Sequence, residues 1–188
     1  KEIQKLVELG GKVEYIQVDI TDRAAFDSKL NEFRKKYGKI NGILHSAGVI
    51  EDNYIIRKTL ESFNRVLLPK IHGTLILDEV TQNDDLDFFA MFSSITAVLG
   101  NEGQCDYAVG NTFMDEFATV RARMVTEGKR KGHSVSINWS LWRNGGMKLT
   151  EEYITNVKNN KGLILLTNSV GIEALTNSLS LPDNNVIV

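Results

Sequence analysis

The sequence predicts an α/β fold built around a doubly wound parallel sheet. Segments with the composition of strands alternate about five times with helical patterns along the 188 residues. One of these segments, at 87–93, is a short, almost entirely apolar run typical of strands that are buried on both faces. This alternation favours a parallel sheet that is covered on both faces and joined by right-handed crossovers.

The strand candidates are short segments bounded by polar residues. The first, at 13–19, follows Gly10-Gly11 and is rich in β-branched and aromatic residues. The other strands are expected at 40–44, 87–93, 134–142 and 185–188.

The helix candidates have apolar residues at helical spacing and clear terminal signals. Thr21 or Asp22 can cap a helix that Gly38 ends, and Thr59 can cap another. Pro69 is expected either to break that helix or to start a new turn. Helices are expected at 1–9, 22–37, 59–80, 104–126 and 168–180. The polar, glycine-bearing interval 143–162 is the best candidate for a mobile lid.

Charge and composition exclude several classes of function. The 22 basic and 24 acidic residues give a net charge of −2, which argues against a nucleic-acid or membrane-surface partner. No apolar run is long enough to span a membrane, and we expect a cytoplasmic protein. Cys105 is the single cysteine, and the three histidines are scattered, so no metal site is expected.

The glycine-rich turn of a dinucleotide-binding unit is missing from this sequence. Such a unit opens with a strand, a Gly-x-Gly-x-x-Gly turn and a helix whose N-terminus faces the pyrophosphate. Gly100-Asn-Glu-Gly103 lacks that spacing. We therefore interpret residues 1–188 as one portion of a catalytic domain that begins at its third strand, without the N-terminal phosphate-binding part.

Ser94 and Tyr107 are the candidates for chemistry. The serine closes an apolar strand, and the tyrosine enters a helix thirteen positions later. Ketone reduction needs a group that polarises the carbonyl and an acid that protonates the oxygen, and these two side chains can supply both. A nearby cation is needed to lower the tyrosine pKa, and Lys70 is our candidate. Asn111 lies one turn after Tyr107, where it could hold a water or orient the lysine.

These residues resemble a known family. Ser94, Tyr107 and Asn111, with Pro69-Lys70-x-x-Gly73 upstream, are similar to the ketoreductase domains of modular polyketide synthases, a branch of the short-chain dehydrogenase/reductases. Most members of that superfamily place lysine, not asparagine, four residues after the tyrosine, and this branch exchanges the two. Further similar segments are His45-Ser-Ala-Gly-Val49, Ser136 to Trp142 with Gly145-Gly146-Met147, and Gly171-Ile-Glu-Ala-Leu175.

The resemblance implies a Rossmann-like sheet of the short-chain dehydrogenase/reductase type, lacking its first two strands here. It implies Tyr107 as proton donor, Ser94 as carbonyl-binding hydroxyl, Lys70 as cationic partner and Asn111 as the fourth member of the site. The hydride would come from NADPH, with Asp19 contacting the adenine and with Ala47 and Gly48 close to the ribose. The implied substrate is a β-ketoacyl thioester on an acyl carrier protein, and other synthase domains are the implied partners.

The resemblance also implies a stereochemical outcome. Ile50-Glu51-Asp52 falls where one subclass carries Leu-Asp-Asp, and Asp52 matches its diagnostic aspartate. Leu99 stands where the opposite subclass carries tryptophan. Both positions favour the D-configured β-hydroxyl.

Other readings remain open at this point. An inactive ketoreductase remnant that braces a neighbouring synthase domain is the main alternative, and a free-standing dehydrogenase is a weaker one. His45, Cys105, Trp139 and Trp142 are more typical of structural than of catalytic positions. The cluster Lys129-Arg130-Lys131 is typical of a solvated loop, with docking of an acidic carrier protein as the less favoured reading.

Overall fold

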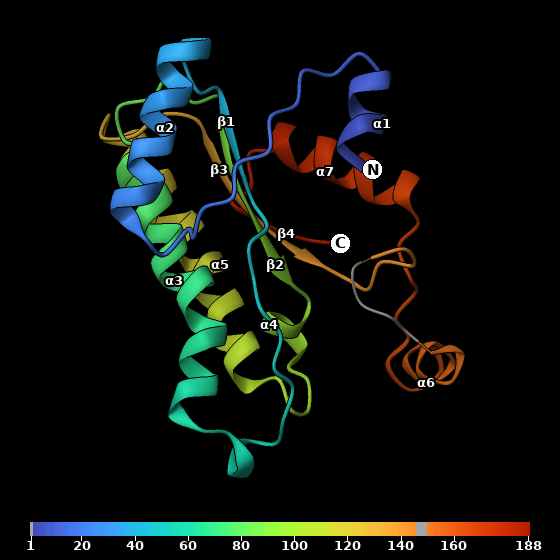
Figure 1. The fold of residues 1–188 in the computed structure, drawn as a ribbon. Helices are drawn as coiled ribbons and strands as arrows, with labels where there is room; N and C mark the ends of the chain where they lie inside the picture. Colours follow the sequence, from blue (N-terminus) through green and yellow to red (C-terminus); the bar gives the residue numbers. More distant parts are fainter. Residues whose placement is uncertain (1, 146–149) are drawn as a thin grey trace.

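A single parallel sheet organises the computed structural model, which describes residues 2–145 and 150–188 (Figure 1). Its strands lie side by side in sequence order, and all neighbouring pairs are parallel. They are β1 (Gly42–His45), β2 (Phe88–Ser94), β3 (His133–Trp139) and β4 (Asn185–Ile187). This arrangement confirms the predicted α/β class, and the four observed strands overlap the last four that the sequence predicts.

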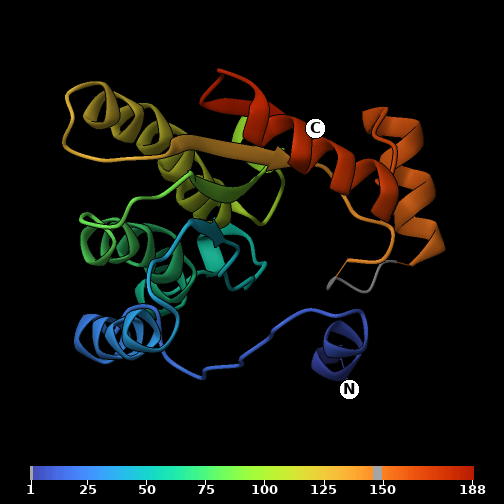
Figure 2. The ribbon, with the colours of Figure 1, turned by 90° about the horizontal axis from the view of Figure 1, so that it is seen from above.

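Helices cover both faces of this sheet, as Figures 1 and 2 show. On one face lie α2 (Arg23–Tyr37), α3 (Leu60–Val80) and α5 (Cys105–Thr126), and on the other lies α7 (Asn168–Ser180). The first face is packed around Phe89, Met91 and Met114, and the second around Val135 and Ile137. The central strands are therefore buried from both sides, which explains the nearly continuous apolar run in β2.

The connections between strands do not all have the same hand. The strand order advances in one direction, yet α3 and α5 cross on one face whereas α7 crosses on the other. The β3–β4 connection therefore has the opposite hand to the two before it. The expectation of uniformly right-handed crossovers is wrong at this last step.

The helix signals read from the sequence act as expected in most places. Asp22 caps α2 by accepting a hydrogen bond from the Ala25 amide at 3.0 Å, and Gly38 ends the helix with a φ of 93°. Thr59 caps α3 in the same way. Pro69, however, lies inside α3, which continues to residue 80 as one helix. Neither of the two outcomes expected at Pro69 occurs.

The strand predicted at 13–19 is absent. Helix α1 (Glu2–Glu8) is present as expected, and an irregular segment then leads from it to α2. Figure 2 shows α1 standing apart from the sheet. A strand is defined by hydrogen bonds to a neighbouring strand, and this segment pairs with none of the four strands. Composition alone therefore does not make it a strand.

The lid candidate at 143–162 includes α6 (Glu151–Lys161). Its base is fixed, because Trp142 and Leu166 form a parallel bridge and the Leu166 amide donates to the Leu141 carbonyl at 2.7 Å. Gly146 and Met147, which belong to one of the segments similar to the ketoreductase family, lie outside the described residues. Among the residues that are described, no helix combines the length and apolar content that a bilayer crossing requires.

Candidate active site

A cavity of about 320 Å³ opens at the carboxyl ends of the strands. Residues that follow β1, the end of β2, the segment after β3 and the start of α5 all line it. In open α/β sheets this edge is where ligands bind. Lys70, Ser94 and Tyr107 line the cavity, together with Gly48 and Leu99. The fold thus brings together Gly48 and Tyr107, which are 59 positions apart in the sequence.

Lys70 reaches the cavity from α3 and is only 3% exposed. Its Nζ lies 3.3 Å from the Phe92 carbonyl oxygen and 5.2 Å from the centroid of the Tyr107 ring. A Cβ atom on Gly48 would come within 3.2 Å of the lysine side chain, and one on Gly110 within 3.1 Å. The two glycines therefore make room for the buried lysine.

Burial determines the protonation behaviour of this pair. Burial lowers the pKa of Lys70 to about 8, although the carboxylate of Asp115 opposes the shift. Burial also raises the pKa of Tyr107, while the side chains of Asn111 and Ser94 act in the opposite direction. Desolvation outweighs these hydrogen bonds in this structure, and the effect of the Lys70 charge on Tyr107 stays a prediction.

Asn111 is completely buried one turn after Tyr107 on α5. Its Nδ2 donates to the Tyr107 carbonyl at 2.7 Å. Its Oδ1 has no hydrogen-bond partner within the described part of the chain. A buried amide oxygen without a partner is a ready acceptor for a water or an ammonium group, the two roles that the sequence suggests.

The end of β2 that carries Ser94 is held by a buried polar network. Asn138 of β3 donates to the Ser94 carbonyl at 3.2 Å, to Ser93 Oγ at 3.1 Å and to Asp115 Oδ2 at 2.8 Å. Asp115 also accepts from Ser136 Oγ at 2.6 Å. The network ties β2, β3 and α5 together directly beneath Ser94. The sequence reading missed Asp115, because its partners lie more than 20 residues away.

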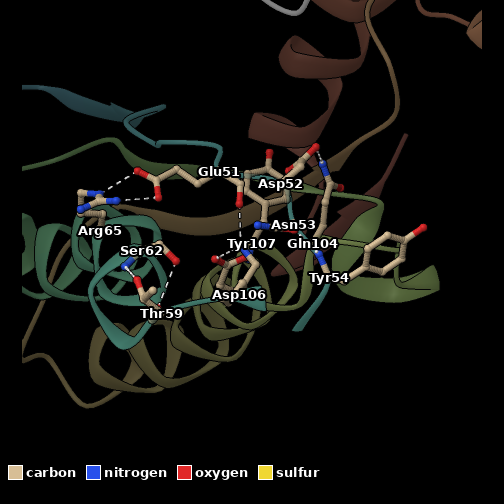
Figure 3. A network of polar contacts seen from close by, with 11 residues as sticks. Glu51, Asp52, Asn53, Tyr54, Thr59, Ser62, Arg65, Gln104, Asp106 and Tyr107 are labelled. Carbon is tan, nitrogen blue, oxygen red and sulfur yellow. Dashed lines mark hydrogen bonds and ion pairs between the residues drawn. The ribbon is translucent and has the colours of Figure 1, made fainter. Parts of the chain in front are cut away.

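Asp52 lies in an irregular loop beside the N-terminus of α5, as Figure 3 shows. Gln104 Nε2 donates to Asp52 Oδ2 at 2.9 Å, and the Asp52 charge contributes to the raised pKa of Tyr107. Leu99 is 61% exposed at the cavity wall, in the short helix α4 (Thr96–Leu99). The two stereochemical candidates are therefore placed near the site, and Gln104 joins them.

The three cofactor candidates have different surroundings. Gly48 lines the cavity, whereas Ala47 is half-buried beside it in sequence. Asp19 is exposed, and its Oδ1 accepts from both the amide and the hydroxyl of Thr21 at 2.8 Å. These bonds lower the pKa of Asp19 and hold its carboxylate in a turn.

The structure shows the surroundings of four further positions for which the sequence favours a structural role. Burial, assisted by the Lys70 charge, lowers the pKa of His45 to about 4, which leaves a neutral imidazole at pH 7. The rings of Trp139 and Trp142 lie 5.1 Å apart, and both also line the cavity. A Cβ atom on Gly171 would collide with the Trp142 ring, so this ring packs against α7. Cys105, with a free thiol, is the half-buried first residue of α5.

Each residue of the basic cluster Lys129-Arg130-Lys131 forms an ion pair with an acidic residue of the same chain. Arg130 contacts Asp78, Lys129 contacts Glu127 and Lys131 contacts Asp85, at distances of 2.7 to 3.0 Å. Asp78 is buried and also binds Arg121. In the part of the chain that is described, no group of three or more histidine, cysteine or acidic side chains could hold a metal ion.

Comparison with known proteins gives a consistent result. The model of the KR domain family matches residues 1–144. Polyketide synthase PksN of Bacillus subtilis is 42% identical over 187 residues, which are 100% of this chain and 3% of that protein. The 6-methylsalicylic acid synthase of Penicillium expansum is 36% identical over 166 residues, or 88% of this chain and 9% of that protein.

Solved structures agree with these sequence matches. A ketoreductase domain from the bacillaene assembly line is 38% identical, with a TM-score of 0.96 over 99% of this chain and 45% of that one. An N-terminal ketoreductase from the macrolactin assembly line is 37% identical, with a TM-score of 0.87 over 99% of this chain and 35% of that one. The chain thus spans less than half of the solved domains it matches and a few per cent of the synthases.

Proposed function

Because the chain belongs to the ketoreductase (KR) domain family of polyketide synthases, we propose that it forms the catalytic part of a domain that reduces a β-ketoacyl thioester to a β-hydroxyacyl thioester. The substrate in this proposal is carried by an acyl carrier protein within a multidomain synthase. The observation that carries the proposal is that Lys70, Ser94 and Tyr107 line one cavity at the carboxyl ends of the strands.

The described residues suit the nicotinamide end of a dinucleotide. Gly48 lines the cavity and has no side chain that would narrow it. NADPH is the cofactor in this proposal, and when bound it supplies the hydride for the carbonyl carbon. Gly48, Ala47 and Asp19 are the residues of this chain that we expect along it.

The chain's own residues handle the carbonyl oxygen and its proton. Ser94 Oγ donates a hydrogen bond to the oxygen, which draws electron density away from the carbonyl carbon. The Tyr107 hydroxyl transfers its proton to the oxygen as the alcohol forms, and its raised pKa keeps it protonated beforehand. The Lys70 ammonium then stabilises the tyrosinate, which takes a proton back from solvent. Asn111 holds the backbone of Tyr107 in place.

The product in this proposal has the D configuration. Asp52 is held by Gln104 near Tyr107, and Leu99 lines the cavity at the position where the opposite subclass carries tryptophan. We infer further that the described parts of the interval 143–162, residues 143–145 and 150–162, belong to a lid over this cavity.

Substitution of Tyr107 tests the proposal. In the full ketoreductase domain, Tyr107→Phe removes the hydroxyl alone, and we expect turnover of a model β-ketoacyl thioester to fall by about 100-fold or more. NADPH titration should show unchanged cofactor binding, and Tyr37→Phe on the exposed face of α2 is the matched control. Undiminished turnover would reject Tyr107 as the acid. A wild-type domain that reduces no keto substrate would favour the inactive remnant.

A further inference from the structure

A buried ion pair lies behind the site, between Lys58 and Asp106. Lys58 Nζ and Asp106 Oδ2 are 2.5 Å apart, and the two side chains are 3% and 2% exposed. Lys58 directly follows the short 3-10 helix η1 (Ile55–Arg57), and Asp106 is the second residue of α5. The pair therefore joins the loop that carries Asp52 to the helix that carries Tyr107.

Each partner makes one further bond that leads to the site. Lys58 Nζ donates to the carbonyl of Glu51, the residue directly before Asp52, at 2.6 Å. Asp106 Oδ1 accepts from the backbone amide of Tyr107 at 2.9 Å. One ion pair thus links the backbone beside Asp52 to the backbone of Tyr107.

Other bonds hold the same junction, as Figure 3 shows. Gln104 contacts Asp52, and the Asn53 amide donates to the Gly103 carbonyl at 2.9 Å. The Glu51 carboxylate is turned away toward Arg65, with which it forms two hydrogen bonds of 2.7 and 3.0 Å. Lys58 is therefore the cation that holds the backbone of this loop, while Arg65 holds the Glu51 side chain.

Stability alone is a weak reason to bury this pair. Removing two charges from water is costly, and apolar side chains of similar size often stabilise a protein as well or better. The geometric effect is more specific, because a displacement of about 1 Å at a reacting group can reduce a rate by about 100-fold.

We propose that Lys58 and Asp106 are a positioning pair, which fixes the Asp52 loop relative to Tyr107 and thereby the face of the ketone that is presented for reduction. This inference rests on the proposed function. Neither residue touches the reacting atoms, since both act through Glu51 and the Tyr107 amide.

Three variants of the full ketoreductase domain test this proposal. Lys58→Met removes the cation, Lys58→Arg keeps it, and Asp106→Asn keeps an oxygen for the Tyr107 amide while removing the charge. Lys29→Met is the control, because Lys29 forms an exposed ion pair with Glu32 on α2. The readouts are the ratio of D to L product, kcat and KM measured separately, NADPH affinity, and amide hydrogen exchange at Tyr107 and residues 50–57.

We expect Lys58→Met and Asp106→Asn to lower kcat by about tenfold or more and to raise the share of the minor isomer, with NADPH affinity changed by less than about twofold. The product ratio of Lys58→Arg should lie between those of Lys58→Met and the wild type. Amide hydrogen exchange at Tyr107 should be faster in Lys58→Met and Asp106→Asn than in the wild type. Lys29→Met should match the wild type. Lower stability with an unchanged product ratio and an unchanged kcat per folded molecule would overturn the proposal.

Failure of the proposed function would look different. A wild-type domain without reductase activity would reject the function and the effect on the product together. If folded Asp106→Asn shows unchanged amide hydrogen exchange at Tyr107 and residues 50–57, the positioning role of the pair is rejected. This outcome does not depend on whether the domain is active. If Lys58→Met does not fold, the comparison of Asp106→Asn with Lys58→Arg decides the question.

Discussion

Lys70 Nζ lies over the face of the Tyr107 ring, 5.2 Å from its centroid. The lysine comes from α3 and the tyrosine from α5, and burial disfavours the charged form of both side chains. A protonated lysine beside a tyrosine is the state that can stabilise a tyrosinate after proton transfer. The charge on Lys70 should therefore control turnover.

The pH dependence of turnover provides the first prediction. The pKa of Lys70 is about 8, so the ammonium form is lost as the pH rises through 8. We expect kcat to fall along an alkaline limb centred near that value. Lys70→Met should lower kcat at pH 7 by about 100-fold and abolish the limb. A limb that persists in Lys70→Met would assign it to another group.

Lys70→Met should also increase the free energy of unfolding. The pKa of Lys70 is lower in the folded protein than in the unfolded chain, so the unfolded state binds more protons between pH 8 and 10.5. Stability therefore rises with pH across that window, and below it the buried charge is destabilising. Lys70→Met should raise the free energy of unfolding at pH 7 by roughly 1–3 kcal/mol. Urea titrations at pH 7 and pH 10 measure the effect, which should shrink at the higher pH.

The charge on Asp115 should set the pH at which kcat falls on the alkaline side. Its carboxylate raises the pKa of Lys70 and accepts from Ser136 and Asn138. Asp115→Asn removes the charge, so the limb should move to lower pH. Ser136→Ala is the matched control, because it removes one hydrogen bond and leaves the charge. A limb that moves equally in both variants would show that the hydrogen bonds, not the charge, set the pKa.

Elements that depend on neighbouring residues could be predicted from the sequence, whereas those that depend on distant residues could not. Caps and apolar patterns predicted α2 and β2 well, because Asp22 and the 87–93 run act through their immediate neighbours. The segment 13–19 has the composition of a strand, but pairing depends on a neighbouring strand, which composition does not supply.

In the candidate site, too, the motif residues could be predicted and the contacts between distant residues could not. The motif around Ser94 and Tyr107, and the need for a cation that pointed to Lys70, predicted residues that do line one cavity. The desolvation that raises the pKa of Tyr107 depends on packing, which motifs do not encode. The Lys58–Asp106 pair spans 48 positions and matches no motif, so only the folded arrangement could reveal it.

The last prediction concerns Asp78, which holds two arginines. Its carboxylate accepts from Arg121 Nε at 2.9 Å and from Arg130 Nε at 3.0 Å, and the Arg121 side chain is only 1% exposed. Burial lowers the pKa of Arg121, yet the guanidinium stays charged and needs this partner.

Asp78→Asn leaves that buried charge without its counter-ion, which typically costs about 3–5 kcal/mol. We expect a loss of roughly that size in the free energy of unfolding, measured by denaturant titration. Glu127→Gln, at an exposed pair with Lys129, should change it by less than about 1 kcal/mol. Equal effects of the two substitutions would mean that Asp78 contributes no more than a surface ion pair. A large loss for Asp78→Asn alone would show that the buried cluster of Asp78, Arg121 and Arg130 stabilises the fold more than a surface ion pair does.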